Sequence, residues 1–214
     1  MRGFVVAALI VASAPAFAQD NAFAKLDASS ALELRRLVDS ATQRGLPSDA
    51  VIGQARHGAL FGVPGAKIVA AARTLTAQLA AARQALSPPE PSPQEIRSGA
   101  EALLQGATPD ALVAVRRASG TKPVAVPLGL LTQLLASKVS LPRATEIVVD
   151  LVRRGAEPRQ LADLGNNLSL DVARGEAPER SLAVHLQALT AVLPAAPGTS
   201  VTVPSAATPV PKKP

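Results

Sequence analysis

The stretch Arg44-Gly45-Leu46-Pro47-Ser48-Asp49 decides the fold, and Phe61-Gly62-Val63-Pro64 is a near copy of it. Glycine adopts positive φ angles without a Cβ clash, so it suits the position just after a helix end. Proline has no N–H group, and the first turn of a helix leaves its N–H groups unpaired, so proline suits a helix start. The pattern therefore predicts that one helix ends and the next begins across a very short connection.

Related joints continue almost to the C-terminus, at Gly106-Ala107-Thr108-Pro109, Ser140-Leu141-Pro142, Gly155-Ala156-Glu157-Pro158 and Gly175-Glu176-Ala177-Pro178. Residues 37–45 also resemble residues 147–155, and a proline-started helix is expected after each of these segments. We therefore predict an all-α protein of helical hairpins joined by short Gly-x-Pro turns. An α-solenoid-like stack and an irregular helical bundle both fit this pattern.

The composition supports an aliphatic helical core and excludes several kinds of site. Hydrophobic residues make up 48% of the chain, but aromatic residues only 2%, with no Trp, Tyr or Cys. The absence of Cys excludes disulfides, thiol nucleophiles and cysteine metal sites. The absence of Trp and Tyr leaves little with which to line a sugar-binding cleft.

The N-terminus has the pattern of an export signal. Arg2 forms a short basic region, residues 4–11 are apolar, and Ala16-Phe17-Ala18 is a small-x-small cleavage box. We expect residues 1–18 to be a signal peptide cleaved after Ala18, with an uncleaved membrane anchor as the alternative. The mature protein is then periplasmic or secreted, and no later segment is apolar enough to span a membrane.

The charge of the chain does not favour nucleic-acid binding. The formal net charge is +6, from 22 basic and 16 acidic residues. Once Arg2, Lys212 and Lys213 are set aside, residues 19–193 carry 19 basic residues against 16 acidic ones. These charges are scattered and no aromatic residues alternate with them, so we expect no nucleic-acid partner. A weak attraction to anionic envelope polymers or lipid headgroups stays open as an alternative.

Proline-rich segments divide the mature chain. Residues 87–91, Ser-Pro-Pro-Glu-Pro, cannot continue a helix and form the expected connector between two subdomains, residues 19–86 and 92–193. The first subdomain is expected to begin its helices with a Ser30/Glu33 capping box, and the second with a Ser92/Glu95 capping box. Residues 120–127 are expected to be irregular, and residues 194–214 to be a disordered tail rich in Pro and Ala.

No residue pattern indicates catalysis, a metal or a cofactor. His57 and His185 lack a partner at metal-ligand spacing, so both are interpreted as ordinary surface or boundary residues. The acidic residues mostly fall at helix starts, where the helix dipole explains them. Arg116-Arg117 and Arg153-Arg154 are interpreted as solvated faces, with contact to an acidic partner as the alternative.

Gly165-Asn166-Asn167 is a polar insertion in an apolar repeat, and a helix break explains it most simply. The alternative is that its amides are presented in a groove. The candidate binding residues are therefore Asn166, Asn167, Arg153 and Arg154.

Three functions remain open. The first is a non-enzymatic helical-repeat protein that binds a protein or peptide partner in the cell envelope. The second is a structural envelope component tethered by its basic, Pro-rich tail. The third, which has the least support, is a hydrolase that uses His57 or His185.

Overall fold

A computed structural model describes residues 23–194 of the chain. The predicted signal peptide (1–18) and nearly all of the predicted tail (194–214) lie outside the described residues. Within them the protein is all-α, as predicted, and has nine helices. These helices are α2 (Ala28–Gln43), α3 (Ser48–Leu60), α4 (Gly65–Leu86), α5 (Pro93–Leu104), α6 (Pro109–Ser119), α7 (Ala125–Ala136), α8 (Leu141–Arg153), α9 (Pro158–Ala173) and α10 (Pro178–Val192).

The short joints have the geometry that their sequence predicts. At the α2–α3 joint, Gly45 has φ of 64°, and its N–H donates to the carbonyl of Thr42. The N–H of Leu46 then donates back to the carbonyl of Ala41, which completes a Schellman motif. The same backward bond closes the joints after α3, α5, α7, α8 and α9. After α7 the positive φ belongs to Lys138, the only such non-glycine residue in the described part of the chain.

Several helix starts differ from the sequence prediction. The Ser30/Glu33 capping box is wrong, because α2 begins one turn earlier, with the Asp27 side chain accepting from the Ser30 N–H. Asp27 thus takes the N-cap role that Ser30 was expected to have, and the N–H group that it caps is that of Ser30 itself. Helix α7 begins at Ala125, inside the segment predicted to be irregular, because a proline such as Pro127 is tolerated in a first turn. The Ser92/Glu95 capping box is confirmed.

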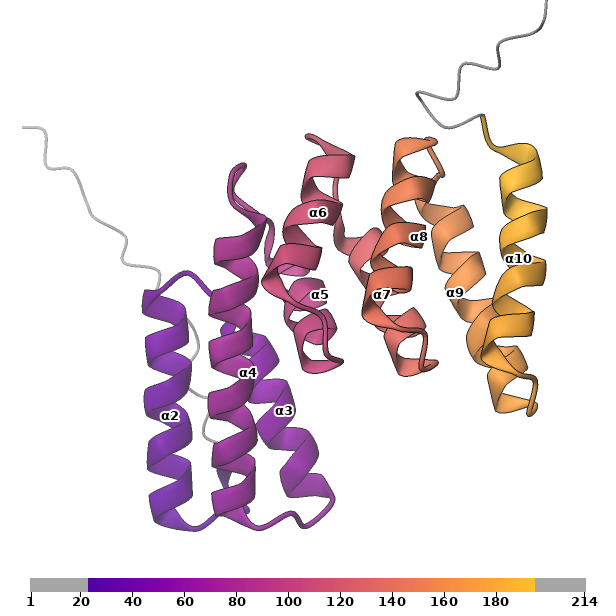
Figure 1. Ribbon diagram of the computed structural model, residues 1–214. Coiled ribbons are helices and arrows are strands. Elements are labelled where there is room, and N and C mark those ends of the chain that lie inside the picture. Colours follow the sequence, from indigo (N-terminus) through magenta and orange to yellow (C-terminus); the bar gives the residue numbers. More distant parts are fainter. Residues whose placement is uncertain (1–22, 195–214) are drawn as a thin grey trace, which may run out of the picture.

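The helices form a three-helix start and then a two-layer row (Figure 1). Helices α2, α3 and α4 all pack against one another. From there, α4, α6 and α8 form one layer, and α5, α7 and α9 form the other. Helix α10 ends the row and packs against α9. The solenoid-like alternative thus describes the row, and a small bundle describes its N-terminal end.

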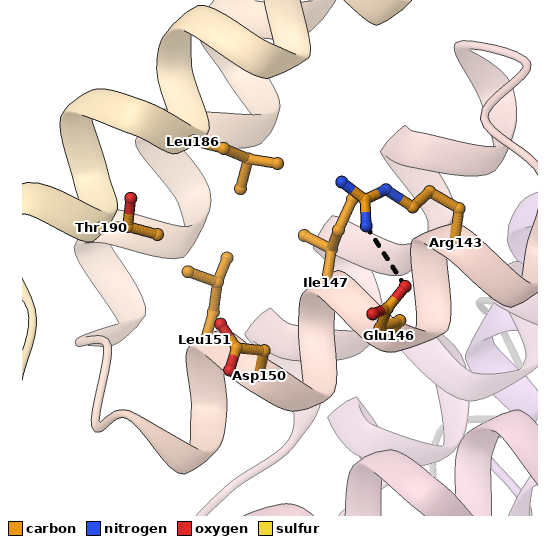
Figure 2. A pocket seen from close by; sticks show the side chains of 7 residues that line it. All are labelled: Arg143, Glu146, Ile147, Asp150, Leu151, Leu186 and Thr190. Carbon is orange, nitrogen blue, oxygen red and sulfur yellow. Dashed lines mark hydrogen bonds and ion pairs between the residues drawn. The ribbon is translucent and has the colours of Figure 1, made fainter. Parts of the chain in front are cut away.

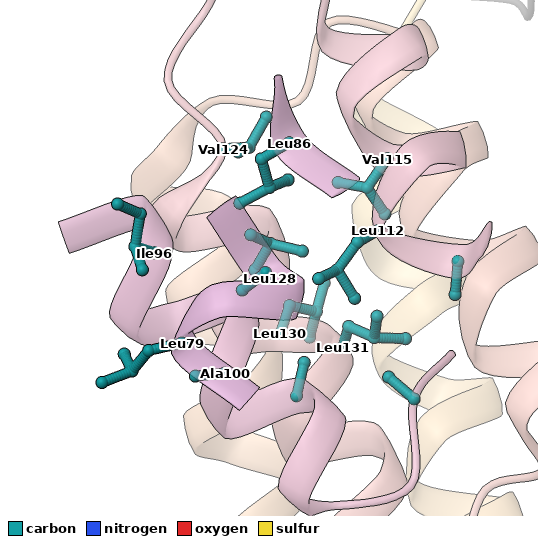
Figure 3. Close-up of a cluster of buried hydrophobic side chains, with 14 of the residues drawn as sticks. Leu79, Leu86, Ile96, Ala100, Leu112, Val115, Val124, Leu128, Leu130 and Leu131 are labelled. Atoms are coloured by element: carbon teal, nitrogen blue, oxygen red, sulfur yellow. The ribbon is translucent and has the colours of Figure 1, made fainter. Parts of the chain in front are cut away.

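The core is aliphatic and continuous across the predicted connector. Figure 3 shows Leu79 and Leu86 of α4 among side chains from α5, α6 and α7, including Leu112 and Leu128. All four of these leucines are fully buried. Small residues let the backbones approach closely: a Cβ atom at Gly99 would lie 2.9 Å from the Cβ of Ala82. The helices on either side of residues 87–91 therefore share one core.

Candidate ligand-binding groove

A buried ion pair anchors the segment that shapes the candidate site. The Arg116 guanidinium on α6 donates to the Glu95 carboxylate on α5 over 2.7 Å, and both side chains are more than 90% buried. Sequence reasoning placed Arg116 on a solvated face, and the structure shows that this was wrong. Glu95 was predicted to act only locally, in a capping box with Ser92 and with the helix dipole, but its carboxylate also has this tertiary partner.

The same carboxylate holds the backbone before α7. Its Oε1 atom accepts from the Val124 N–H over 2.9 Å, and its Oε2 atom accepts from the Ser92 N–H over 2.8 Å. Arg116 in turn donates to the carbonyl of Lys122. Burial by itself would raise the pKa of Glu95, but these hydrogen bonds outweigh it and lower the pKa to about 2. The carboxylate therefore stays ionised and keeps residues 120–124 in place.

The segment so anchored forms one wall of a hollow of about 410 Å³. Its other walls are the first turns of α7 and α9 and the C-terminal end of α8. The lining is mainly apolar and includes Pro123, Val126, Pro127, Val152, Pro158 and Leu161. Polar groups such as Gln94, Lys122 and Glu157 add donors and acceptors. This size and lining are typical of a site that takes one or two apolar side chains or a small ligand.

A second hollow, of about 270 Å³, continues along the α5–α7–α9 layer. Val126 lines both hollows, so the two are neighbours on α7. The second is lined by Gly129 and Leu130 of α7, with Glu101 of α5 and Ala162 of α9. We call the two hollows together the α7 groove.

An amide pair lies in the second hollow. The Gln133 side-chain amide donates to Asn166 Oδ1 over 3.2 Å, and both residues line the hollow. Each amide keeps further donor and acceptor positions, which suits the backbone of an extended peptide. The α7 groove thus combines apolar depressions with amides that can bind a backbone.

The predicted helix break at Gly165-Asn166-Asn167 is wrong, because α9 runs without interruption through these residues. Gly165 is buried, and a Cβ atom there would collide with the Gln133 side chain. The glycine therefore allows the close approach of α7 and α9, rather than ending the helix.

The four predicted binding residues lie on different surfaces. Asn166 lines the α7 groove, whereas Asn167 lines a separate hollow between α9 and α10. Arg153 is exposed at the end of α8. Arg154 pairs with Asp150, and its Nε–H donates to the Pro194 carbonyl, so it links the C-terminal end of α8 to the chain two residues after α10.

The sequence analysis did not select the residues that form most of the groove, namely Val126, Gly129 and Gln133. Gly129 carried one usable signal, because a glycine inside an otherwise apolar helix often marks a close approach or an open surface. The structure shows that Gly129 lies at an open surface, since no atom lies within 4 Å of a Cβ atom built there.

A third hollow lies between α8 and α10 (Figure 2). It measures about 240 Å³ and exists because α10 packs against α9 rather than against α8. Leu186 of α10 faces Ile147 and Leu151 of α8, and an Arg143–Glu146 ion pair closes one side. It is smaller than the first hollow and ends in charged side chains, so it is a weaker candidate for apolar ligands.

The two histidines have different surroundings, and His185 belongs to a hydrogen-bonded cluster between α9 and α10. His185 Nε2 lies 2.8 Å from Asp171 Oδ2, and the Ser181 hydroxyl donates to the same oxygen over 2.7 Å. The hydrogen bond from Ser181 holds the pKa of Asp171 below its usual value, and the bond to His185 lowers it further. A catalytic serine would instead donate to the histidine. This cluster therefore ties α9 to α10. His57 is exposed and contacts Phe61.

Among residues 23–194, no group of three or more His, Asp or Glu side chains is placed to hold a metal ion. No helix in the same range combines the length and the apolar character needed to cross a membrane.

Comparison with protein-family models, curated proteins and solved structures finds no match to this chain.

Proposed function

We propose that this chain is an exported, non-enzymatic helical-repeat protein that holds an extended peptide segment of a partner protein in the cell envelope. The observation that carries the proposal is the α7 groove, in which two apolar hollows share Val126 and lead to the Gln133–Asn166 amide pair. Extended surfaces of this kind are what helical repeats commonly use to bind peptides.

The groove suits a peptide because its two parts supply different contacts. The larger hollow takes apolar side chains, which contribute affinity through burial. The amide pair offers hydrogen bonds to a main chain, which any sequence provides. The Glu95–Arg116 pair holds the groove wall in one conformation before binding, so little ordering is needed on association.

The groove can be blocked without disturbing the core. Gly129 lies inside α7, with open space where its Cβ would be, so Gly129→Leu places a side chain in the groove. Gly53 in α3 is the matched control, because it is also helical, also open at the Cβ position and outside the groove. Leucine favours helix formation over glycine at both positions, so both variants should fold.

The test uses a random dodecapeptide phage library selected against purified residues 19–214. Enriched peptides are then synthesised with a fluorescent label and titrated by anisotropy. We expect Gly129→Leu to weaken their binding about ten-fold or more, and Gly53→Leu to leave it unchanged. If every enriched peptide binds the Gly129→Leu variant as well as the unsubstituted protein, the α7 groove is not the binding site.

Export has a separate test. N-terminal sequencing of the protein recovered from the cell envelope or the medium should start at Gln19. Recovery of the protein only from the cytoplasm, with Met1 retained, would contradict this part of the proposal.

A further inference from the structure

An apolar tip projects from the joint between α3 and α4. Leu60 is 67% exposed, Phe61 is 73% exposed and Val63 is 37% exposed. The only other Phe in the described part of the chain, Phe23, is 1% exposed. The remaining large apolar side chains that are exposed within residues 23–194 are not adjacent in the sequence. We call Leu60, Phe61 and Val63 the α3–α4 tip.

The backbone holds this tip in a closed turn. Gly62 has φ of 67°, and the Val63 N–H donates to the Gly58 carbonyl over 2.9 Å, which completes a Schellman motif. The His57 ring lies 4.7 Å from the Phe61 ring and tilted against it, so the phenylalanine is supported from one side only. None of the hollows described above is lined by the three tip residues. The tip therefore lies outside these hollows, with Leu60 and Phe61 largely exposed to solvent.

Positive charge borders the tip. Arg56 precedes Leu60 by four residues and Lys67 follows Val63 by four, and both are exposed. Neither forms an ion pair within residues 23–194, whereas Arg73 pairs with Glu33 and Arg83 with Glu90. Residues 50–89 contain no Asp or Glu at all.

Gly65 lies two residues after Val63, and a Cβ atom at Gly65 would touch the Asp27 carboxylate. Asp27, and Lys25 two residues before it, therefore lie at the same end of the molecule as the tip. The Asp27 carboxylate caps α2 and accepts from Ser29 and Ser30. Of the described residues named here, Asp27 is the one carboxylate and Lys25, Arg56 and Lys67 are three cations, so their summed charge is positive.

We infer that the α3–α4 tip inserts shallowly into the surface of an anionic phospholipid bilayer. Leu60 and Phe61 enter the boundary between headgroups and acyl chains, and Arg56 and Lys67 contact the phosphates. Exposed apolar side chains bordered by unpaired cations are the combination that binds peripheral proteins to anionic lipid. The contact is separate from the α7 groove, so it would hold the protein at a membrane while the groove stays open.

The first test is cosedimentation of residues 19–214 with sucrose-loaded vesicles of equal parts phosphatidylglycerol and phosphatidylcholine. The variant Leu60→Ser/Phe61→Ser should lower the partition coefficient about ten-fold or more. The matched control is Leu170→Ser/Val184→Ser, since these residues of α9 and α10 are 53% and 59% exposed. The control should bind like the unsubstituted protein. Equal binding of the two double variants, or no binding by the unsubstituted protein, would overturn the inference.

A second measurement uses the absence of Trp from the chain. Phe61→Trp creates a single fluorophore, whose emission should shift to shorter wavelength with anionic vesicles and should be quenched by brominated acyl chains. Leu170→Trp should show neither effect. The shift should weaken in 0.5 M salt or with phosphatidylcholine alone, because the cations contribute through screened attraction. An unshifted Trp at position 61 with vesicles present would also overturn the inference.

Discussion

Removing the Glu95 carboxylate should destabilise the protein strongly, although Glu95 lies at a helix start where an acidic residue is usually a minor contributor. In Glu95→Ala, Arg116 remains 94% buried with its main partner gone. The Val124 N–H also loses its acceptor, and the Arg116 Nε atom already has no partner. Breaking a buried pair in this way costs about 3–5 kcal/mol.

The pKa of Glu95 gives a second magnitude for the same set of contacts. A shift from 4.5 to about 2 corresponds to about 3 kcal/mol in favour of the folded state with the carboxylate ionised. Because the folded-state pKa is lowered, this stabilisation is present above about pH 4.5 and is lost as the pH falls towards 2. Glu95→Gln should remove the carboxylate's share of this acid sensitivity.

The assay is urea unfolding followed by helical circular dichroism at pH 7. With a typical m-value of about 2 kcal/mol/M, Glu95→Ala should lower the midpoint by about 1.5–2.5 M. The control is Glu33→Ala, which breaks the exposed pair with Arg73, whose side chains are 40% and 59% exposed. That loss should be below about 1 kcal/mol.

A double-variant cycle separates the pair from other effects. Arg116→Met should destabilise the protein on its own, because the Glu95 charge then remains buried. The combination Glu95→Ala/Arg116→Met should lose at least about 2 kcal/mol less than the sum of the single losses, since no charge is left uncompensated. Additivity within about 0.5 kcal/mol, or a Glu95→Ala effect no larger than that of Glu33→Ala, would refute this reasoning.

Two further predictions concern exchanges between glycine and other residues, and urea unfolding measures the free energy of unfolding for both. Gly129→Ala, with open space at its Cβ, should stabilise α7 by about 0.5–1 kcal/mol, whereas Gly165→Ala should gain less than this, because its new Cβ must push the end of the Gln133 side chain away from Asn166. Lys138→Gly should stabilise the protein by about 0.5–1 kcal/mol by removing a left-handed non-glycine residue. Lys138→Ala, which keeps the strained φ, should give no gain, and equal results for the two Lys138 variants would contradict the explanation.

The helix ends could be predicted because their causes are local. The N–H of Leu46 and the carbonyl of Ala41 are five residues apart, so the glycine between them decides the turn. The Ser92/Glu95 capping box is local in the same way. The predicted start of α2 failed because Asp27 competes with Ser30 for the N-cap, and both residue types are favourable there.

Of the four residues selected from the sequence as candidate binding residues, only Asn166 lines the α7 groove. Asn166 lies in the α7 groove, but Asn167, its neighbour, lines a different hollow beside α10. Consecutive residues on a helix point about 100° apart, so a dipeptide motif cannot indicate a shared surface. Val126 and Gln133 carried no signal in the sequence, because an apolar or amide residue on a helix is usually ordinary packing or solvated surface.

The sequence by itself determined the all-α class, the positions of the glycine–proline joints and the aliphatic character of the core. Each of these depends on backbone preferences or side-chain types within a few residues. Only the tertiary structure decided that Arg116 is buried against Glu95, that α7 and α9 approach at Gly165, and that Phe61 projects into solvent. These features depend on which helix faces meet, and that is decided by packing among residues far apart in the chain.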